Sequence, residues 1–155
     1  MSQSLERGYI TQAYNNNESD GTCCLIALIH EGKVSVASIG DSTALLLSQG
    51  GQMIELTNEH TPNRYDEYIR VQQAGGRLLH LSSSLRVEGV LQVTRSIGDK
   101  DFKQYLSSVP EICSMNIKAN DQVLILSSDG IFEKIPKEEI HLHISSLRAR
   151  GLTLP

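Results

Sequence analysis

The sequence predicts an α+β fold, an α-β-β-α layered sandwich of two mostly antiparallel sheets flanked by helices. Short apolar runs, such as residues 23–29 and 122–126, lack the alternation of a half-exposed strand and indicate strands covered on both faces. For residues 122–126, a buried helical segment is the alternative. Amphipathic helical patterns occur towards both ends of the chain, and mostly short connections favour antiparallel pairing.

Length and composition indicate one globular domain. The chain has 155 residues, of which 39% are hydrophobic and 21% charged, which is enough for a substantial core. A net charge of −4, with lysines and arginines scattered, gives no support for nucleic-acid binding. No apolar run is long enough to span a bilayer or form a signal core, and the three cysteines include no Cys-x-x-Cys pair. We therefore expect an intracellular protein, cytoplasmic or nuclear, without a membrane partner.

Apolar periodicity and turn-forming residues predict the individual elements. Helices are expected at residues 4–15, 66–74 and 136–148. Strands are expected at residues 23–29, 33–39, 44–47, 53–56, 77–81, 91–94, 112–117 and 122–126. We expect the first four strands to form a meander and the last two to form an antiparallel pair. A mobile serine-rich loop is expected at residues 82–84.

Two aspartates directly follow apolar strands. Asp41 comes after Ile39-Gly40, and Asp129 comes after the strand at residues 122–126. Strand ends in adjacent sheets can bring two carboxylates to one edge of a sandwich. Glu133 can reach the same place if a helical turn begins at Asp129. Oxygen ligands without imidazole or thiolate suit Mg²⁺ or Mn²⁺. The alternative interpretation is an Asp-Gly turn with a purely structural role.

Several segments occur in an order that carries a family resemblance. The most specific is Arg-Val-Glu-Gly-Val-Leu-Gln-Val-Thr-Arg-Ser-Ile-Gly-Asp at residues 86–99, which lies between Gly40-Asp41-Ser42 and Ser128-Asp129-Gly130. The other matching segments are residues 22–29, 38–42, 56–62, 66–76 and 126–132. From about Asp20 to Glu133, the chain resembles the metal-dependent serine/threonine phosphatases of the protein phosphatase 2C family.

The resemblance implies a β-sandwich that hydrolyses phosphoserine and phosphothreonine in proteins with two Mg²⁺ or Mn²⁺ ions. It implies that Asp129 is a ligand of this metal pair and that Asp41, Asp129 and Glu133 surround a third, weaker metal. The family usually has aspartate at the position of Glu133. His60 and Asp99 match motif positions that we interpret as structural. Residues 57–86 correspond approximately to the flap beside the family's active site, which influences substrate choice.

The resemblance is incomplete. The family's Glu-Asp pair, its Asp-Gly-His-Gly-Gly motif, its phosphate-binding arginine and its Asp-Asn motif have no counterparts in this sequence. We therefore expect residues 1–155 to be the middle portion of a phosphatase domain, truncated at both ends and inactive alone. The alternative is a non-catalytic, phosphatase-like module that binds a partner or a phosphoprotein through its flap. The sequence does not indicate the oligomeric state.

Overall fold

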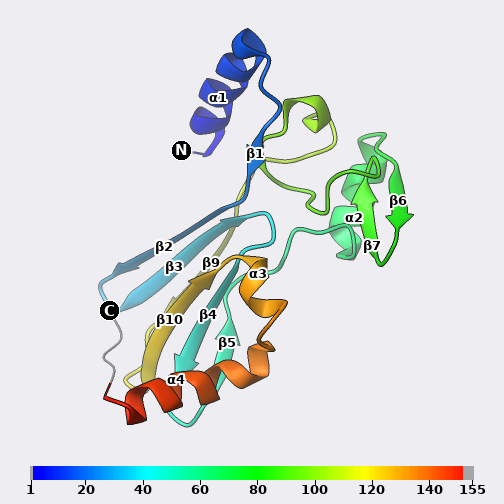
Figure 1. Ribbon diagram of the computed structural model, residues 1–155. Helices are drawn as coiled ribbons and strands as arrows, with labels where there is room; N and C mark the ends of the chain where they lie inside the picture. Colours follow the sequence, from blue (N-terminus) through cyan, green and yellow to red (C-terminus); the bar gives the residue numbers. More distant parts are fainter. Residues whose placement is uncertain (1, 152–155) are drawn as a thin grey trace.

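The computed structural model describes residues 2–151 of the chain, and it confirms the predicted sandwich. Figure 1 shows two stacked sheets in the lower half of the molecule, with a lateral lobe beside them and α1 at the opposite end. The order of strands is β2-β3-β9 in one sheet and β10-β4-β5 in the other, and all of these pairs are antiparallel.

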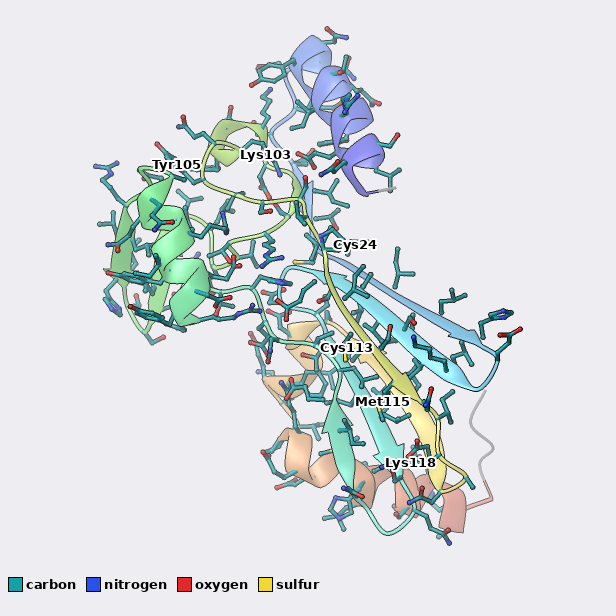
Figure 2. All side chains as sticks on the ribbon, turned by 180° about the vertical axis from the view of Figure 1, so that it is seen from behind. Cys24, Lys103, Tyr105, Cys113, Met115 and Lys118 are labelled. Carbon is teal, nitrogen blue, oxygen red and sulfur yellow. The ribbon has the colours of Figure 1, made fainter. Side chains whose placement is uncertain are left out.

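The first sheet contains β2 (Cys24–His30), β3 (Lys33–Ile39) and β9 (Glu111–Asn116), and the second contains β4 (Thr43–Ser48), β5 (Met53–Glu55) and β10 (Asp121–Ser127). Their facing sides form the core because side chains alternate along each strand. The buried centre of this core consists of Val34, Val36, Ala44, Leu46 and Leu56. Cys113 and Met115, labelled on β9 in Figure 2, pack against it.

Two predicted strand pairings are wrong. The first four strands form no single meander, because the chain passes from one sheet to the other after β3, at Gly40, where φ is 98°. Likewise β9 and β10 do not pair with each other. β9 pairs with β3, and β10 pairs with β4. The turn between them therefore joins the two layers, whereas a local hairpin would have kept both strands in one layer.

A lateral lobe contains α2 (Tyr65–Gln73) and the hairpin of β6 (Leu78–Leu81) and β7 (Ser84–Val87). It has its own core of buried residues, Val71, Val87 and Leu106. The strand predicted at residues 91–94 is wrong, since Leu91 forms only an isolated bridge with Val87. The predicted serine-rich loop is instead a tight turn with Ser82 at φ 57°, and Ser84 already belongs to β7. β6 thus pairs with the strand that immediately follows this turn.

At the opposite end, α1 (Ser2–Asn16) packs on β8 (Ile97–Gly98), which pairs with β1 (Gly21–Thr22). Glu6 of α1 accepts the Gly98 N–H at 3.0 Å and contacts Lys103 Nζ at 2.9 Å. Lys103 follows a short 3₁₀ turn, η1 (Lys100–Phe102). The helical region at residues 4–15 is therefore confirmed, and it is attached through polar as well as apolar contacts.

After β10 come α3 (Asp129–Phe132), η2 (Lys137–Glu139) and α4 (Ile140–Ala149). The predicted last helix is confirmed, with a 3₁₀ turn at its start. Figure 1 shows α4 lying across the sheet of β4, β5 and β10, and Ile140 is buried there. Across residues 2–151, none of the helices combines the length and apolar character needed to cross a membrane.

Candidate metal centre

Three strand ends meet at one end of the sandwich. Ser127 of β10 lies opposite Thr43 of β4. Asp129 lies two residues after the former and Asp41 two residues before the latter, so the antiparallel register carries both aspartates to the same end. In the other sheet Cys24 is opposite Ile39, which places Cys23 beside Gly40. The architecture thus brings together two of the three predicted site residues.

The thiol of Cys23 contacts the first of the two aspartates, Asp41. Its Sγ donates a hydrogen bond to Asp41 Oδ1 at 3.1 Å. Burial raises the pKa of Cys23 to about 12, and the negative charges of Asp41 and Asp129 act in the same direction. The thiol retains its proton at neutral pH.

His60 holds the backbone that precedes Asp41. Its backbone N–H donates to Gly40 O at 2.9 Å, and its Nδ1 lies 2.9 Å from Gly40 O and 3.2 Å from Gly40 N. The side chain is fully buried, with Nε2 at 3.4 Å from Glu111 Oε2. Burial lowers the pKa of His60, which favours a neutral ring. These contacts agree with the structural role expected for His60.

Asp99, like His60, makes backbone contacts, and these lie away from Asp41 and Asp129. It adopts a left-handed conformation with φ 52°, and its N–H donates to Asp20 O at 2.8 Å. A Cβ at Gly21 would collide with the Asp99 carboxylate, so this close approach needs glycine. The contacts support the expected structural role.

Glu133 follows the helical turn on which its predicted role depends. Its N–H donates to Asp129 O at 3.1 Å, so the turn begins at Asp129 as expected. The side chains of Asp129 and Glu133 are both exposed, whereas Asp41 is half-buried. Within residues 2–151 no three His, Cys, Asp or Glu side chains are grouped closely enough to hold a metal ion. Two neighbouring carboxylates fit a weakly held, hard divalent cation with water completing its shell, and Glu133 stays a predicted ligand.

A buried ionic cluster, missed by the sequence interpretation, joins α2 to the segment that follows β7. Glu67 is 1% exposed and accepts hydrogen bonds from Thr94 Oγ1 at 2.6 Å and from Arg95 Nη2 at 2.6 Å. Arg70 binds the same carboxylate at 2.9 Å. Burial opposes the charge, but these donors outweigh it and lower the pKa of Glu67 to about 2. The available signal was the position of Glu67 on the same helix face as the apolar Val71.

The cluster extends to the turn that carries Asp41. Glu111 of β9 contacts Arg64 Nη2 at 2.7 Å and Arg95 Nη2 at 3.9 Å, and its Oε2 faces His60. Salt bridges and hydrogen bonds therefore run from the lateral lobe to the backbone of Gly40. This places the lobe beside the candidate metal centre.

The chain forms an α-β-β-α sandwich of two stacked antiparallel sheets with outer helices and a lateral lobe. Asp41 and Asp129, at one end of the sandwich, form its candidate metal centre. The family model described as protein phosphatase 2C matches residues 2–150, and the chain belongs to this family. Members of the family are generally metal-dependent.

Individual relatives agree with this assignment. A probable protein phosphatase 2C 2 of Arabidopsis thaliana is 38% identical over 143 residues, covering 90% of this chain and 37% of that protein. A probable protein phosphatase 2C 68 of Oryza sativa subsp. japonica is 40% identical over 118 residues, covering 76% of this chain and 32% of that protein. The structure of a C. elegans sex determining protein superimposes with a TM-score of 0.90 at 26% identity, covering 94% of this chain and 36% of that one. The chain therefore spans about a third of the length of these relatives.

Proposed function

We propose that this chain is part of a metal-dependent phosphatase that hydrolyses phosphoserine and phosphothreonine in proteins, with Mg²⁺ or Mn²⁺ as the cofactor. The observation that carries the proposal is the strand register, which brings Asp41 and Asp129 to the same end of a sandwich of this family. A bound divalent ion supplies positive charge for phosphoryl oxygens and lowers the pKa of bound water. No nucleophilic side chain is then required.

The chain's own residues would hold and orient the ion. Asp41 and Asp129 supply hard oxygen ligands, and Glu133 is the proposed third carboxylate. Gly40 and His60 fix the turn from which Asp41 projects. The lateral lobe, which overlaps the proposed flap at residues 57–86, would lie beside a phosphoprotein substrate and influence its choice.

We expect the chain of 155 residues to show no appreciable phosphatase activity by itself. Its sequence has no Asp-Gly-His-Gly-Gly and no Asp-Asn motif, so it offers too few ligands for a pair of metals. The assay is hydrolysis of para-nitrophenyl phosphate and of a phosphothreonine peptide with millimolar Mn²⁺. Turnover of about 1 s⁻¹ or more, abolished by Asp129→Ala, would contradict this expectation and establish an active enzyme.

The second candidate is a non-catalytic interaction module of the same family. It is favoured by one observation, that residues 2–151 contain no three acidic, histidine or cysteine side chains grouped for a metal. Titration with Mn²⁺, followed by paramagnetic broadening of amide signals, separates the two. The phosphatase proposal expects millimolar binding, about −4 kcal/mol, at Asp41 and Asp129, lost in the Asp41→Asn/Asp129→Asn variant. Broadening elsewhere, or unchanged in that variant, favours the module.

An intracellular location, cytoplasmic or nuclear, is part of the proposal. Cys23, Cys24 and Cys113 are all free thiols, which is usual for proteins of reducing compartments. Adjoining coding sequence with in-frame Asp-Gly-His-Gly and Asp-Asn motifs would support the enzyme over the module.

A further inference from the structure

Two adjacent cysteines have different surroundings at the start of β2. Cys23 Sγ approaches the Asp41 carboxylate at 3.1 Å. Cys24 lies beside Ile26 and Ile112 in a cavity on the outer face of the same sheet. Figure 2 labels Cys24 where the sheet approaches the α1 end of the molecule. Because neighbouring strand residues face opposite ways, only Cys23 is available to the paired aspartates.

The backbone around Cys23 leaves little freedom for its side chain. Gly40 lies opposite it at φ 98°, and a Cβ at that position would collide with Cys23 Sγ. His60 fixes Gly40 from the other side through the two short contacts with its backbone. The thiol is therefore held against Asp41 by packing on β2 and by the fixed turn. An unperturbed thiol keeps its proton at pH 7, so in this contact the sulfur donates and the carboxylate accepts.

We propose that the Cys23 thiol is a positioning residue that holds the Asp41 carboxylate in one orientation, so that its oxygens are arranged before a cation binds. The inference rests on the proposed function for its consequence, although the orientation of Asp41 can be measured without metal. Partners that orient a metal ligand commonly change metal affinity 10–100-fold when they are removed. A thiol is a weak donor, so we expect the lower end of that range. A hydroxyl at the same place should serve at least as well.

The test compares Cys23→Ala, Cys23→Val and Cys23→Ser with the matched control Cys24→Ala. The first readout uses metal-free protein, in which three-bond NMR couplings give the χ1 rotamers of Asp41. We expect one dominant rotamer in the unmodified chain, in Cys23→Ser and in Cys24→Ala. Averaged rotamers are expected in Cys23→Ala and Cys23→Val. The valine variant fills most of the thiol's volume, so it separates loss of the donor from loss of packing.

The second readout is the Mn²⁺ concentration that half-broadens the amide signals around Asp41 and Asp129. We expect it to rise about tenfold in Cys23→Ala and Cys23→Val and to change less than about twofold in Cys23→Ser and Cys24→Ala. Thermal unfolding shows which variants are folded. The test requires only that one of Cys23→Ala and Cys23→Val is folded.

The possible results separate the positioning role of Cys23 from the proposed metal centre. If Asp41 keeps a single rotamer in a folded Cys23→Ala or Cys23→Val protein, the positioning role is wrong. An unchanged Mn²⁺ midpoint in these variants overturns it equally. If the unmodified chain shows no broadening at Asp41 and Asp129, the proposed metal centre fails, while the rotamer measurement still decides the role of Cys23.

Discussion

The strands β2 and β4, one from each sheet of the sandwich, have similarly apolar sequences but are buried differently. All six residues of β4, in the second sheet, are buried. In the first sheet, Leu28 of β2 is 64% exposed and Ile112 of β9 is 68% exposed. The sequences of β2 and β4 are apolar on both faces, so their composition alone would suggest equal burial. The difference shows that an apolar face identifies a surface that can be covered, not one that is covered.

The physical cause is the position of the helices. Leu45 and Leu47 point away from the shared core, since Ala44 and Leu46 face it, and they are buried on the side where α4 lies. On the first sheet, Leu5 of α1 reaches only one end of the outer face, across a cavity of about 250 Å³.

Ion pairs join the first sheet to residues that flank the lateral lobe. Glu111 of β9 binds Arg64 at 2.7 Å and lies 3.9 Å from Arg95, which is itself held by Glu67. Apolar packing under α4 seals the second sheet instead. The two sheets should therefore respond differently to truncation, acid and salt.

The largest expected effect is that of truncating the Leu45 side chain, which is 2% exposed and lies on the α4 side of the second sheet. Leu45→Ala should lower the free energy of unfolding by about 3–4 kcal/mol, because it removes buried methyl groups and leaves a cavity. The matched change Leu28→Ala, on the exposed face of the first sheet, should cost under about 1 kcal/mol. Urea unfolding monitored by circular dichroism measures both. Equal costs would show that the outer faces of the two sheets are covered alike.

Acid should loosen the lateral lobe, because the Glu67 carboxylate joins α2 to Thr94 and Arg95. The pKa of Glu67 falls from an ordinary 4.5 to about 2 on folding, so its stabilisation is complete above about pH 4.5 and is lost as the pH falls towards 2. This lowering of the pKa corresponds to about 3 kcal/mol in the free energy of unfolding. Glu67→Gln should remove most of this pH dependence in denaturant titrations between pH 2 and 6. Glu31→Gln, whose side chain is 84% exposed, is the control and should leave the dependence unchanged.

Hydrogen exchange should show the difference in stability between the two sheets strand by strand. We expect amides of β4 to open only with global unfolding, because this strand is central and buried. Amides of β2, an edge strand with exposed apolar side chains, should open at a free energy lower by about 1–2 kcal/mol. Native-state exchange measured by NMR decides this. Uniform protection of both strands at about 5 kcal/mol or more would instead indicate a self-sufficient domain.

The smallest expected effect on stability comes from the contacts of Lys137 on the α4 side of the second sheet. Lys137 of η2 contacts Glu55 at 2.6 Å and Glu59 at 3.3 Å, and its Nζ lies 5.3 Å from the centre of the Phe132 ring. These side chains are partly exposed, so Lys137→Ala should cost only about 0.5 kcal/mol, and less at high salt. Thermal unfolding at low and high ionic strength is the measurement. A loss above about 2 kcal/mol would mean that this charge cluster, rather than apolar packing, holds α4.

Local patterns predicted most of the backbone correctly. The helices near both ends and the sandwich strands lie within a few residues of their expected bounds. Asp41 and Asp129 were predicted to meet because each follows an apolar strand, and the register places them at one end. That these carboxylates bind a metal, and that Glu133 joins them, stays a prediction.

The sequence by itself determined which segments become strands and helices, because side-chain periodicity and turn residues act over a few neighbouring positions. It also carried the family motifs around Asp41 and Asp129. Only the tertiary structure decided that β9 pairs with β3 and β10 with β4, because pairing depends on distant backbone partners. Tertiary structure also decided which apolar faces are covered, how Glu67 is neutralised by Arg70 and Arg95, and that Cys23 rather than Cys24 meets Asp41. Except for the pair of Glu67 and Arg70 on one helix, these contacts join residues far apart in sequence, where a local pattern holds no information about distance.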